Sequence, residues 1–294
     1  SSADDPDGGK AVYLVNISDG TLEKELTHDD LGMVVAPISI EAGPRPMRIE
    51  KFYLGDHKGS VFEGNVSSYL KENWNLERVF TPGDSKNDNT GIPFAVEVGF
   101  VKNSKWLFWG TGDPDGLFGN QEGTNSIVAL RRAAGGPNIS WNSLQSLDFD
   151  DVHSVSSSAD GWRMPLASKE TVTTPPVISG GKLYVATYIP VVDDNCMVGD
   201  SKLYILDAVT GRGGWDDGKK YVKLDASKIS GITMSEGKIY VGITRYPGAK
   251  ELPTELGEVT LSGNLLIIDD PQYEGDGGDG SYKQENKTIR PTYW

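Results

Sequence analysis

Residues 201–211 read SKLYILDAVTG, and this stretch decides the fold class. Apolar and aromatic side chains fill its first half, which is typical of a β-strand that packs on a pleated surface. The strand is expected to close at Asp207, because Thr210 and Gly211 supply a tight turn in which glycine adopts a positive φ without steric cost. We therefore interpret Asp207 as a turn residue and not as a catalytic acid.

A phrase made of Gly or Ser, Lys, an apolar residue and an aromatic recurs along the chain. Its copies are GGKAVYLVN (8–16), IEKFYLGD (49–56), NSKWLFWGTG (103–112), GGKLYVATY (180–188), DSKLYILDA (200–208) and EGKIYVGIT (236–244). The copy at 180–188 is followed closely by that at 200–208, and the copy at 236–244 by SGNLLIIDD (262–270), as expected for neighbouring strands of one sheet. The pattern predicts an all-β chain built from the blades of a β-propeller.

Charge and hydropathy exclude two classes of partner. The chain of 294 residues has 28 Lys plus Arg and 42 Asp plus Glu, a formal net charge of -14, which repels nucleic acid and anionic membranes. No apolar run approaches the roughly 20 residues that span a bilayer, so no membrane span is expected. By length and composition, residues 1–294 form one globular unit or two closely joined ones, with flexible acidic ends expected at 1–9 and 271–285.

Catalytic motifs are missing from the sequence. It contains no Gly-x-Ser-x-Gly elbow, His-Glu-x-x-His helix, phosphate-binding loop or Cys-x-x-Cys-His motif. Its single cysteine, Cys196, excludes an internal disulfide and a zinc site made of several thiolates. His57 follows Asp56 in an expected hairpin and is predicted to face solvent, and the tryptophans are expected to pack between blades. We therefore predict a protein that is not an enzyme.

The acidic segment DPDGLFGNQE (113–122) is the candidate metal site. Its candidate calcium ligands are Asp113, Asp115, Asn120 and Glu122, because calcium binds carboxylate and amide oxygens. Leu117 stands where a calcium loop of the EF-hand kind needs a third oxygen, and the glutamate comes two residues early. A solvated acidic loop is the alternative, and calcium is the only cofactor that the residues suggest.

Several phrases, taken in order, resemble the C-terminal β-propeller domain of the PilY-type proteins, adhesins of the type IV pilus tip. TPPVISGGKLYVATYIP (174–190) is followed by Cys196 and then by the LDAVTG ending, in the order that the family shows. Further phrases that resemble the family are KFYLGDHKGSVFEGNV (51–66), WLFWGTGDPDG (106–116), GWRMPLASKETVTTPPV (161–177) and RPTYW (290–294). The resemblance covers nearly the whole chain.

This resemblance implies a non-enzymatic role in adhesion or pilus assembly. The protein would reach the bacterial cell surface or pilus tip through the periplasm and bind pilins or minor pilins and a surface receptor. Its contact loops are expected at 113–125, 190–201 and 245–262. The chain would supply the C-terminal part of the propeller, about four blades, and a second chain carrying the N-terminal blades is a further expected partner.

The sequence departs from the family before the Tyr53 hairpin. PilY-type proteins carry an Asp-rich calcium loop there, whereas this chain has Pro44, Arg45, Pro46 and Arg48. These residues cannot supply the six to eight oxygens that calcium takes, so this calcium site is expected to be lost.

Two other readings of the blades stay open. Quinoprotein-type dehydrogenases have blades with similar turns and resemble an eight-bladed disc with a calcium-bound quinone and paired cysteines. This chain has one cysteine and too few residues for eight blades of about 40–45 residues each. A generic interaction propeller with no link to pili is the remaining alternative.

Overall fold

The computed structural model describes residues 9–42, 49–82, 90–114, 123–148, 155, 159–190, 192–193, 196–197, 199–215, 218–225, 227–235, 237–245 and 259–269. These residues form β-strands, numbered β1 to β23, and two short 3-10 helices, with no α-helix among them. The prediction of an all-β chain is confirmed. In this part of the chain no helix is long and apolar enough to cross a membrane. The predicted acidic ends lie outside the described residues, except for Gly9.

Consecutive strands build antiparallel sheets, which we number I to V along the chain. Sheet I consists of β1 (Val12–Val15) and β2 (Leu22–Leu26). Sheet II places β3 (Ser39–Ala42), β4 (Ile49–Gly55), β5 (Val61–Asn65) and β6 (Asn75–Thr81) side by side in chain order, with the 3-10 helix η1 (Lys71–Asn73) before β6. Sheet III does the same with β7 (Glu97–Val101), β8 (Ser104–Gly110), β9 (Ser126–Arg132) and β12 (Gly161–Pro165).

Sheets IV and V contain the two pairs of neighbouring copies predicted from the sequence. In sheet IV, β15 (Lys182–Ile189) pairs with β18 (Asp200–Asp207), between β13 (Thr171–Val172) and β14 (Val177–Ser179) on one side and β19 (Tyr221–Leu224) on the other. Sheet V has the order β20 (Ser227–Ser235), β21 (Lys238–Arg245), β23 (Leu265–Asp269), β22 (Val259–Ser262). A hairpin of β16 (Val192–Asp193) and β17 (Cys196–Met197) lies between β15 and β18 in the chain.

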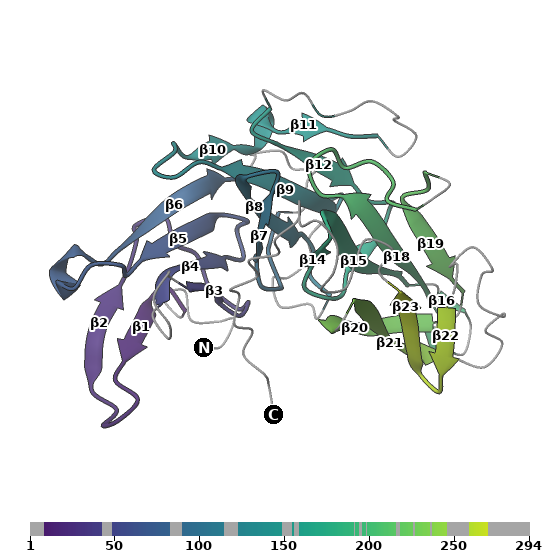
Figure 1. The fold of residues 1–294 in the computed structure, drawn as a ribbon, viewed down its shortest axis with the longest axis horizontal. Helices are drawn as coiled ribbons and strands as arrows, with labels where there is room; N and C mark the ends of the chain where they lie inside the picture. The colour runs from purple at the N-terminus through teal and green to yellow at the C-terminus, as the bar shows by residue number, and fades with distance from the viewer. Residues whose placement is uncertain are drawn as a thin grey trace, which may run out of the picture.

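Each pair of neighbouring sheets shares a hydrophobic core of its own. Figure 1 shows the sheets one after another along an arc, from β1 and β2 at one end to β22 and β23 at the other. In β8, Trp106 and Phe108 pack with sheet IV, whereas Leu107 and Trp109 pack with sheet II. Because successive side chains of a strand point to opposite faces, the central strands of sheets III and IV are buried on both sides. This arrangement explains why the sequences of β8, β9, β15 and β18 are mostly apolar.

The segment 139–146, which we call the strap, joins one edge of sheet II to one edge of sheet III. Its β10 (Ile139–Ser140) pairs in parallel with β6, and its β11 (Gln145–Ser146) pairs in parallel with β12. Between them, the 3-10 helix η2 (Trp141–Ser143) buries Trp141 at a ring-centroid distance of 6.2 Å from Phe80. The Arg163 guanidinium lies 4.8 Å from the Trp141 ring centroid. Trp141 therefore packs between sheets, as predicted for the tryptophans, and Trp106, Trp109 and Trp162 are buried too.

The turn at Asp207 has the predicted form. Its Oδ1 accepts hydrogen bonds from the amides of Val209 (3.1 Å) and Thr210 (2.7 Å) and from the Thr210 hydroxyl (2.8 Å). Gly211 adopts a φ of 65° and donates its amide to the Asp207 carbonyl at 2.8 Å. The carboxylate is thus engaged by its own turn, which supports the interpretation of Asp207 as a structural residue.

Two other predicted turns have related geometry. The Asn16 Oδ1 atom accepts a hydrogen bond from the Ser18 amide, and the Asn16 carbonyl accepts one from the Gly20 amide. Gly20 has a φ of 75°. Gly59 closes the hairpin between β4 and β5 with a φ of 89°. In each turn, glycine takes a conformation that other residues adopt only at a cost.

Candidate interaction face

The long connections of sheets III to V occupy equivalent places. Each follows the second strand of its sheet, namely β8, β15 and β21. They correspond to the contact loops predicted at 113–125, 190–201 and 245–262, although residues 200–201 belong to β18 and residues 259–262 to β22. In sheet II the same place is occupied by the tight turn 56–60 between β4 and β5. Residues 115–122 and 246–258 lie outside the described residues.

Hydrogen bonds place the 56–60 turn and the start of the 111–125 connection at the same end of their sheets. The Ile92 amide, in the segment that leads into sheet III, donates to the Asp56 carbonyl at 3.1 Å. The Gly112 amide, just after β8, donates to the Gly91 carbonyl at 3.0 Å. We call this end the loop face. Two polar clusters, at Asp56 and Glu170, hold its connections in place, and a third cluster lies near the other end of β8.

Asp56 forms the first cluster as a fully buried carboxylate. Its Oδ1 accepts the amides of Lys58 (2.9 Å) and Ser60 (2.8 Å) within the β4–β5 turn. Its Oδ2 accepts the amide of Gly32 at 2.8 Å, from the connection between sheets I and II. Burial raises the pKa of Asp56, and the three amides oppose this effect because they favour the ionised form. The carboxylate therefore fixes its own turn and the neighbouring connection together.

His57 makes a second attachment to the same connection. Its Nδ1 accepts the amide of Met33 at 2.8 Å, and its own amide donates to the Met33 carbonyl at 3.0 Å. The imidazole is half-buried, so the prediction that His57 faces solvent is wrong. Gly32 leaves the necessary space, because a Cβ there would lie 2.7 Å from His57 Nδ1. The imidazole is held by a segment 24 residues away, which a hairpin pattern cannot indicate.

The base of the 111–125 connection contains buried polar atoms that make no hydrogen bond with described residues. These atoms are Asn125 Oδ1, Ser126 Oγ and Thr171 Oγ1. Gly112 permits the close approach of Thr171, since a Cβ at Gly112 would lie 2.3 Å from Thr171 Oγ1. Oxygen atoms buried in this way commonly bind ordered water.

The predicted calcium ligands fall mostly outside the described residues. Asp113 is described and half-buried, whereas Asp115, Asn120 and Glu122 are not described. Among the described residues there is no group of three or more His, Cys, Asp and Glu side chains that could hold a metal ion. The calcium site at 113–122 stays a prediction.

Glu170 forms the second cluster, in the segment that precedes β13. Its fully buried carboxylate accepts the hydroxyls of Thr187 (2.5 Å) and Tyr204 (2.8 Å) and the ammonium of Lys202 (2.7 Å). Its carbonyl accepts the side-chain amide of Asn125 at 2.7 Å, which ties the 111–125 connection to sheet IV. Burial, with the nearby Glu170 charge, raises the pKa of Tyr204, so its hydroxyl stays protonated and donates. The Glu170 carboxylate thus has hydrogen-bond partners within the cluster, and the cluster braces the 111–125 connection against sheet IV.

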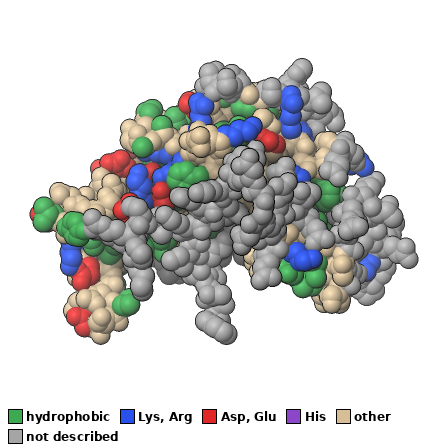
Figure 2. Space-filling model, viewed as in Figure 1, with side chains coloured by type: hydrophobic (Ala, Val, Ile, Leu, Met, Phe, Trp, Pro, Cys, Tyr) green, Lys and Arg blue, Asp and Glu red, His purple; other side chains and the backbone are tan. Residues whose placement is uncertain are grey.

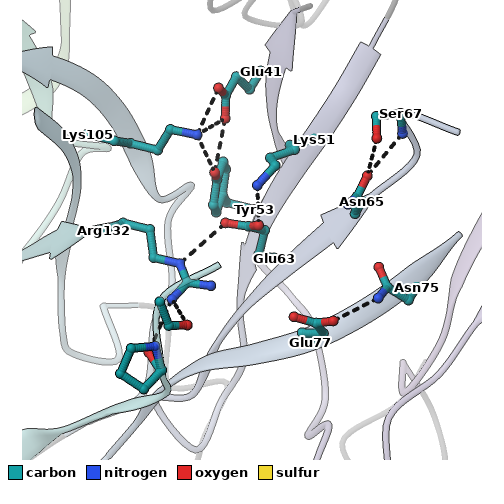
Figure 3. A network of polar contacts seen from close by, with 12 residues as sticks. Glu41, Lys51, Tyr53, Glu63, Asn65, Ser67, Asn75, Glu77, Lys105 and Arg132 are labelled. Carbon is teal, nitrogen blue, oxygen red and sulfur yellow. Dashed lines mark hydrogen bonds and ion pairs between the residues drawn. The ribbon is translucent and has the colours of Figure 1, made fainter. Parts of the chain in front are cut away.

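A third cluster lies between sheets II and III, near the other end of β8, and Figure 3 shows its members. The Glu41 carboxylate accepts the Lys105 ammonium at 2.7 and 2.8 Å and the Tyr53 hydroxyl at 3.0 Å. The Lys105 ammonium also lies 5.5 Å from the centroid of the Phe100 ring. Burial, followed by the charges of the nearby carboxylates, raises the pKa of Tyr53.

Glu63 extends this cluster across the sheet (Figure 3). It accepts the Lys51 ammonium at 2.5 Å, and the Arg132 guanidinium lies 3.4 Å away. Burial disfavours the ionised carboxylate, but the hydrogen bond and charge of Lys51 with the charge of Arg132 outweigh burial and lower the pKa of Glu63. Arg132 also donates to the carbonyl of Gly136 at 2.6 Å, which anchors the segment leading to the strap.

These clusters explain three lysines of the recurring phrase, namely Lys51, Lys105 and Lys202. In both β4 and β18 a lysine precedes a tyrosine by two residues, as Lys51 with Tyr53 and Lys202 with Tyr204. Residues two apart in a strand share a face, so the ammonium and the hydroxyl reach carboxylates on the same side. Neither these roles nor the partners Glu41 and Glu170 were predicted from the sequence. The available signal was a lysine inside an otherwise apolar buried strand, which requires an acidic partner.

A shallow cavity of about 330 Å³ lies at the end of sheets III and IV opposite the loop face. It is lined by Val101, Lys102, Gly180, Gly181, Lys182, Asp207, Gly213 and Gly214. The Oδ1 atom of Asp207, one of these lining residues, is engaged by its own turn.

Comparison with protein-family models and with curated proteins finds no match to this chain.

Proposed function

We propose that this chain is the C-terminal part of a PilY-like β-propeller and acts, without catalysis, as a tip adhesin or assembly factor of type IV pili at the bacterial cell surface. The observation that carries the proposal is the succession of sheets II to V, each with four strands or more and each packed on the next through its own core. Such repetition is the architecture of propeller blades. The ordered phrases of the sequence supply the link to pili.

In this proposal the sheets form a rigid scaffold, and the long connections carry the residues that bind partners. The braces at Asp56 and Glu170 hold the bases of the connections, so that their outer residues are presented from a fixed frame. Binding residues are commonly carried on loops that a rigid scaffold positions. The proposed contacts with pilins or minor pilins, and with a surface receptor, lie at 113–125, 190–199 and 246–258.

The buried carboxylates of the loop face support a role in scaffolding over one in catalysis. Asp56 is surrounded by backbone amides, and Glu170 is paired with Lys202 and two hydroxyls. A catalytic acid or base needs a lone pair or proton that a substrate can reach. Both carboxylates instead use their hydrogen-bonding capacity within the fold.

Purification of the complex from piliated cells tests the proposal. The affinity-tagged chain is produced in a bacterium that makes type IV pili, and the surface fraction released by shear is analysed by mass spectrometry. We expect pilins or minor pilins to co-purify, and replacing residues 115–122 with a Gly-Ser linker of equal length to reduce their yield. A matched control changes the turn residues Lys102 and Asn103, at the opposite end, to Asn-Gly, which suits the same positive φ values.

Two outcomes would contradict the proposal. In the first, the folded chain reaches the surface without pilins, which leaves a generic interaction propeller. In the second, the purified protein shows quinone absorbance and dye-linked alcohol oxidation, which assigns it to the dehydrogenases.

A further inference from the structure

Sheet I has two strands, whereas each of sheets II to V has at least four. Strand β2 leads into the first strand of sheet II, just as β6 leads into sheet III and β19 leads into sheet V. By this order, β1 and β2 hold the third and fourth places of their sheet. The first two places, beside the free edge of β1, hold no strand among the residues that the structure describes.

The face of sheet I that points away from sheet II is apolar and exposed. Tyr13 is 59% exposed, Val15 49% and Leu22 57%. Val15 and Leu22 are cross-strand partners and therefore share this face. Side chains on the opposite face of the same strands, such as Val12, are buried in the core shared with sheet II. In the inner sheets both faces are covered, so sheet I differs from them on this side.

Charge adds to the character of this surface. Glu25 is exposed and lies directly across from Tyr13, so its carboxylate belongs to the same face. Figure 2 shows hydrophobic, acidic and basic side chains together at this end of the molecule. A basic side chain beside apolar ones would complement this combination.

The edge of β1 that pairs with no other described strand carries neither a charged residue nor proline. Its sequence is VYLV. Edge strands of natural proteins commonly carry charged residues or proline, because an unpaired edge is a template for another strand. An unprotected edge next to an exposed apolar face suits recognition by strand addition.

We propose that β1 accepts an antiparallel strand from another polypeptide, whose apolar side chains lie beside Tyr13 and Val15 on the same face and whose lysine approaches Glu25. The chemistry of this strand follows from the strands that hold the second place elsewhere, which all pair antiparallel with the third. Their sequences are IEKFYLG, SKWLFWG, KLYVATYI and KIYVGITR, a lysine followed by apolar and aromatic residues. The inference deepens the proposed function and rests on its repeated four-stranded sheets.

Hydrogen exchange of the full chain with a synthetic peptide tests this proposal. The probe is a capped peptide of the β15 sequence KLYVATYI, and the control peptide has proline in place of its valine and threonine, which removes two backbone donors. We expect the first peptide to slow amide exchange at residues 11–16 by tenfold or more, and the control peptide to have no effect. Exchange in β22, the edge strand of sheet V, should not change.

Two variants locate the contact. Val15→Lys places a charge on the proposed face and should weaken peptide binding at least tenfold. Phe100→Lys makes the same kind of change at an exposed apolar residue of β7 and should leave binding unchanged. Because both wild-type side chains are about half exposed, both variants are expected to fold, which circular dichroism verifies.

Each contrary result overturns the proposal. At a peptide concentration of about 1 mM even a weak complex forms, so the absence of any protection from amide exchange at residues 11–16 excludes strand addition at β1. Dimerisation of the chain alone that Val15→Lys abolishes would assign this edge to self-association. Neither result affects the co-purification of pilins, so a failure here is distinguishable from a failure of the proposed function.

Discussion

The Glu170 carboxylate lies 2.7 Å from the Lys202 ammonium, and both side chains are buried. The pair joins the segment before β13 to the first half of β18, and two hydroxyls complete it. Lys202, the lysine of one copy of the recurring phrase, is therefore an internal brace of the loop face.

Removal of the Glu170 charge should destabilise the fold strongly. Glu170→Gln keeps the shape but leaves the Lys202 ammonium buried without a counter-charge, which costs about 3–5 kcal/mol in unfolding free energy. Urea denaturation measures the change. As a control, Lys223→Gln removes a half-exposed ammonium near Asp200 and Asp225 and should cost less than about 1 kcal/mol. Equal losses for the two variants would contradict the role of Glu170.

Alanine substitutions at Gly211 and Gly20 should separate backbone strain from steric overlap. Both glycines have a positive φ, 65° and 75°, so each alanine should cost about 1 kcal/mol. A Cβ at Gly211 would also lie 2.3 Å from Leu147 Cδ1, whereas Gly20 has nothing within 4 Å. Overpacking should therefore add about 1–3 kcal/mol at Gly211 alone. Thermal or urea unfolding that shows equal losses would contradict this packing.

The buried Asp56 carboxylate should make stability fall with rising pH. Its pKa is raised in the folded state, so between its ordinary value of 3.8 and the raised value the folded chain binds more protons than the unfolded chain. The free energy of unfolding therefore decreases as pH rises through this window. We expect urea titrations to show that the free energy of unfolding of wild type, minus that of Asp56→Asn, decreases as pH rises through this window. If this value increases with pH instead, the three amide hydrogen bonds lower the pKa of Asp56 by more than burial raises it.

Trp141 should control the strap. Trp141→Ala removes a buried ring that contacts Phe80 and Arg163, and should cost about 3–5 kcal/mol. Hydrogen exchange should rise first at residues 139–146, because β10 and β11 are short strands that depend on this contact. Phe100→Ala, at a half-exposed ring of sheet III that lies 5.5 Å from the Lys105 ammonium, serves as the control and should cost about 1 kcal/mol at most. Unchanged exchange in the strap would show that its pairing does not depend on Trp141.

The sequence determined the strands and their turns, because these depend on residues that are close together in the chain. Alternation in KLYVATYI and the turn chemistry of Asp207 and Gly211 are local, and the structure agrees with both. Neighbouring copies of the recurring phrase were enough to predict the pairing of β15 with β18, since a hairpin needs only two adjacent strands.

Tertiary structure alone decided what the polar side chains do. Glu170 meets Lys202 across 32 residues, Glu41 meets Lys105 across 64, and His57 meets Met33 across 24. Such partners are selected by the packing of one sheet on the next, and no local pattern encodes which carboxylate a buried lysine will reach. The same packing shows sheet I as a pair of strands with an exposed apolar face, because exposure depends on what lies beside a strand and not on its sequence.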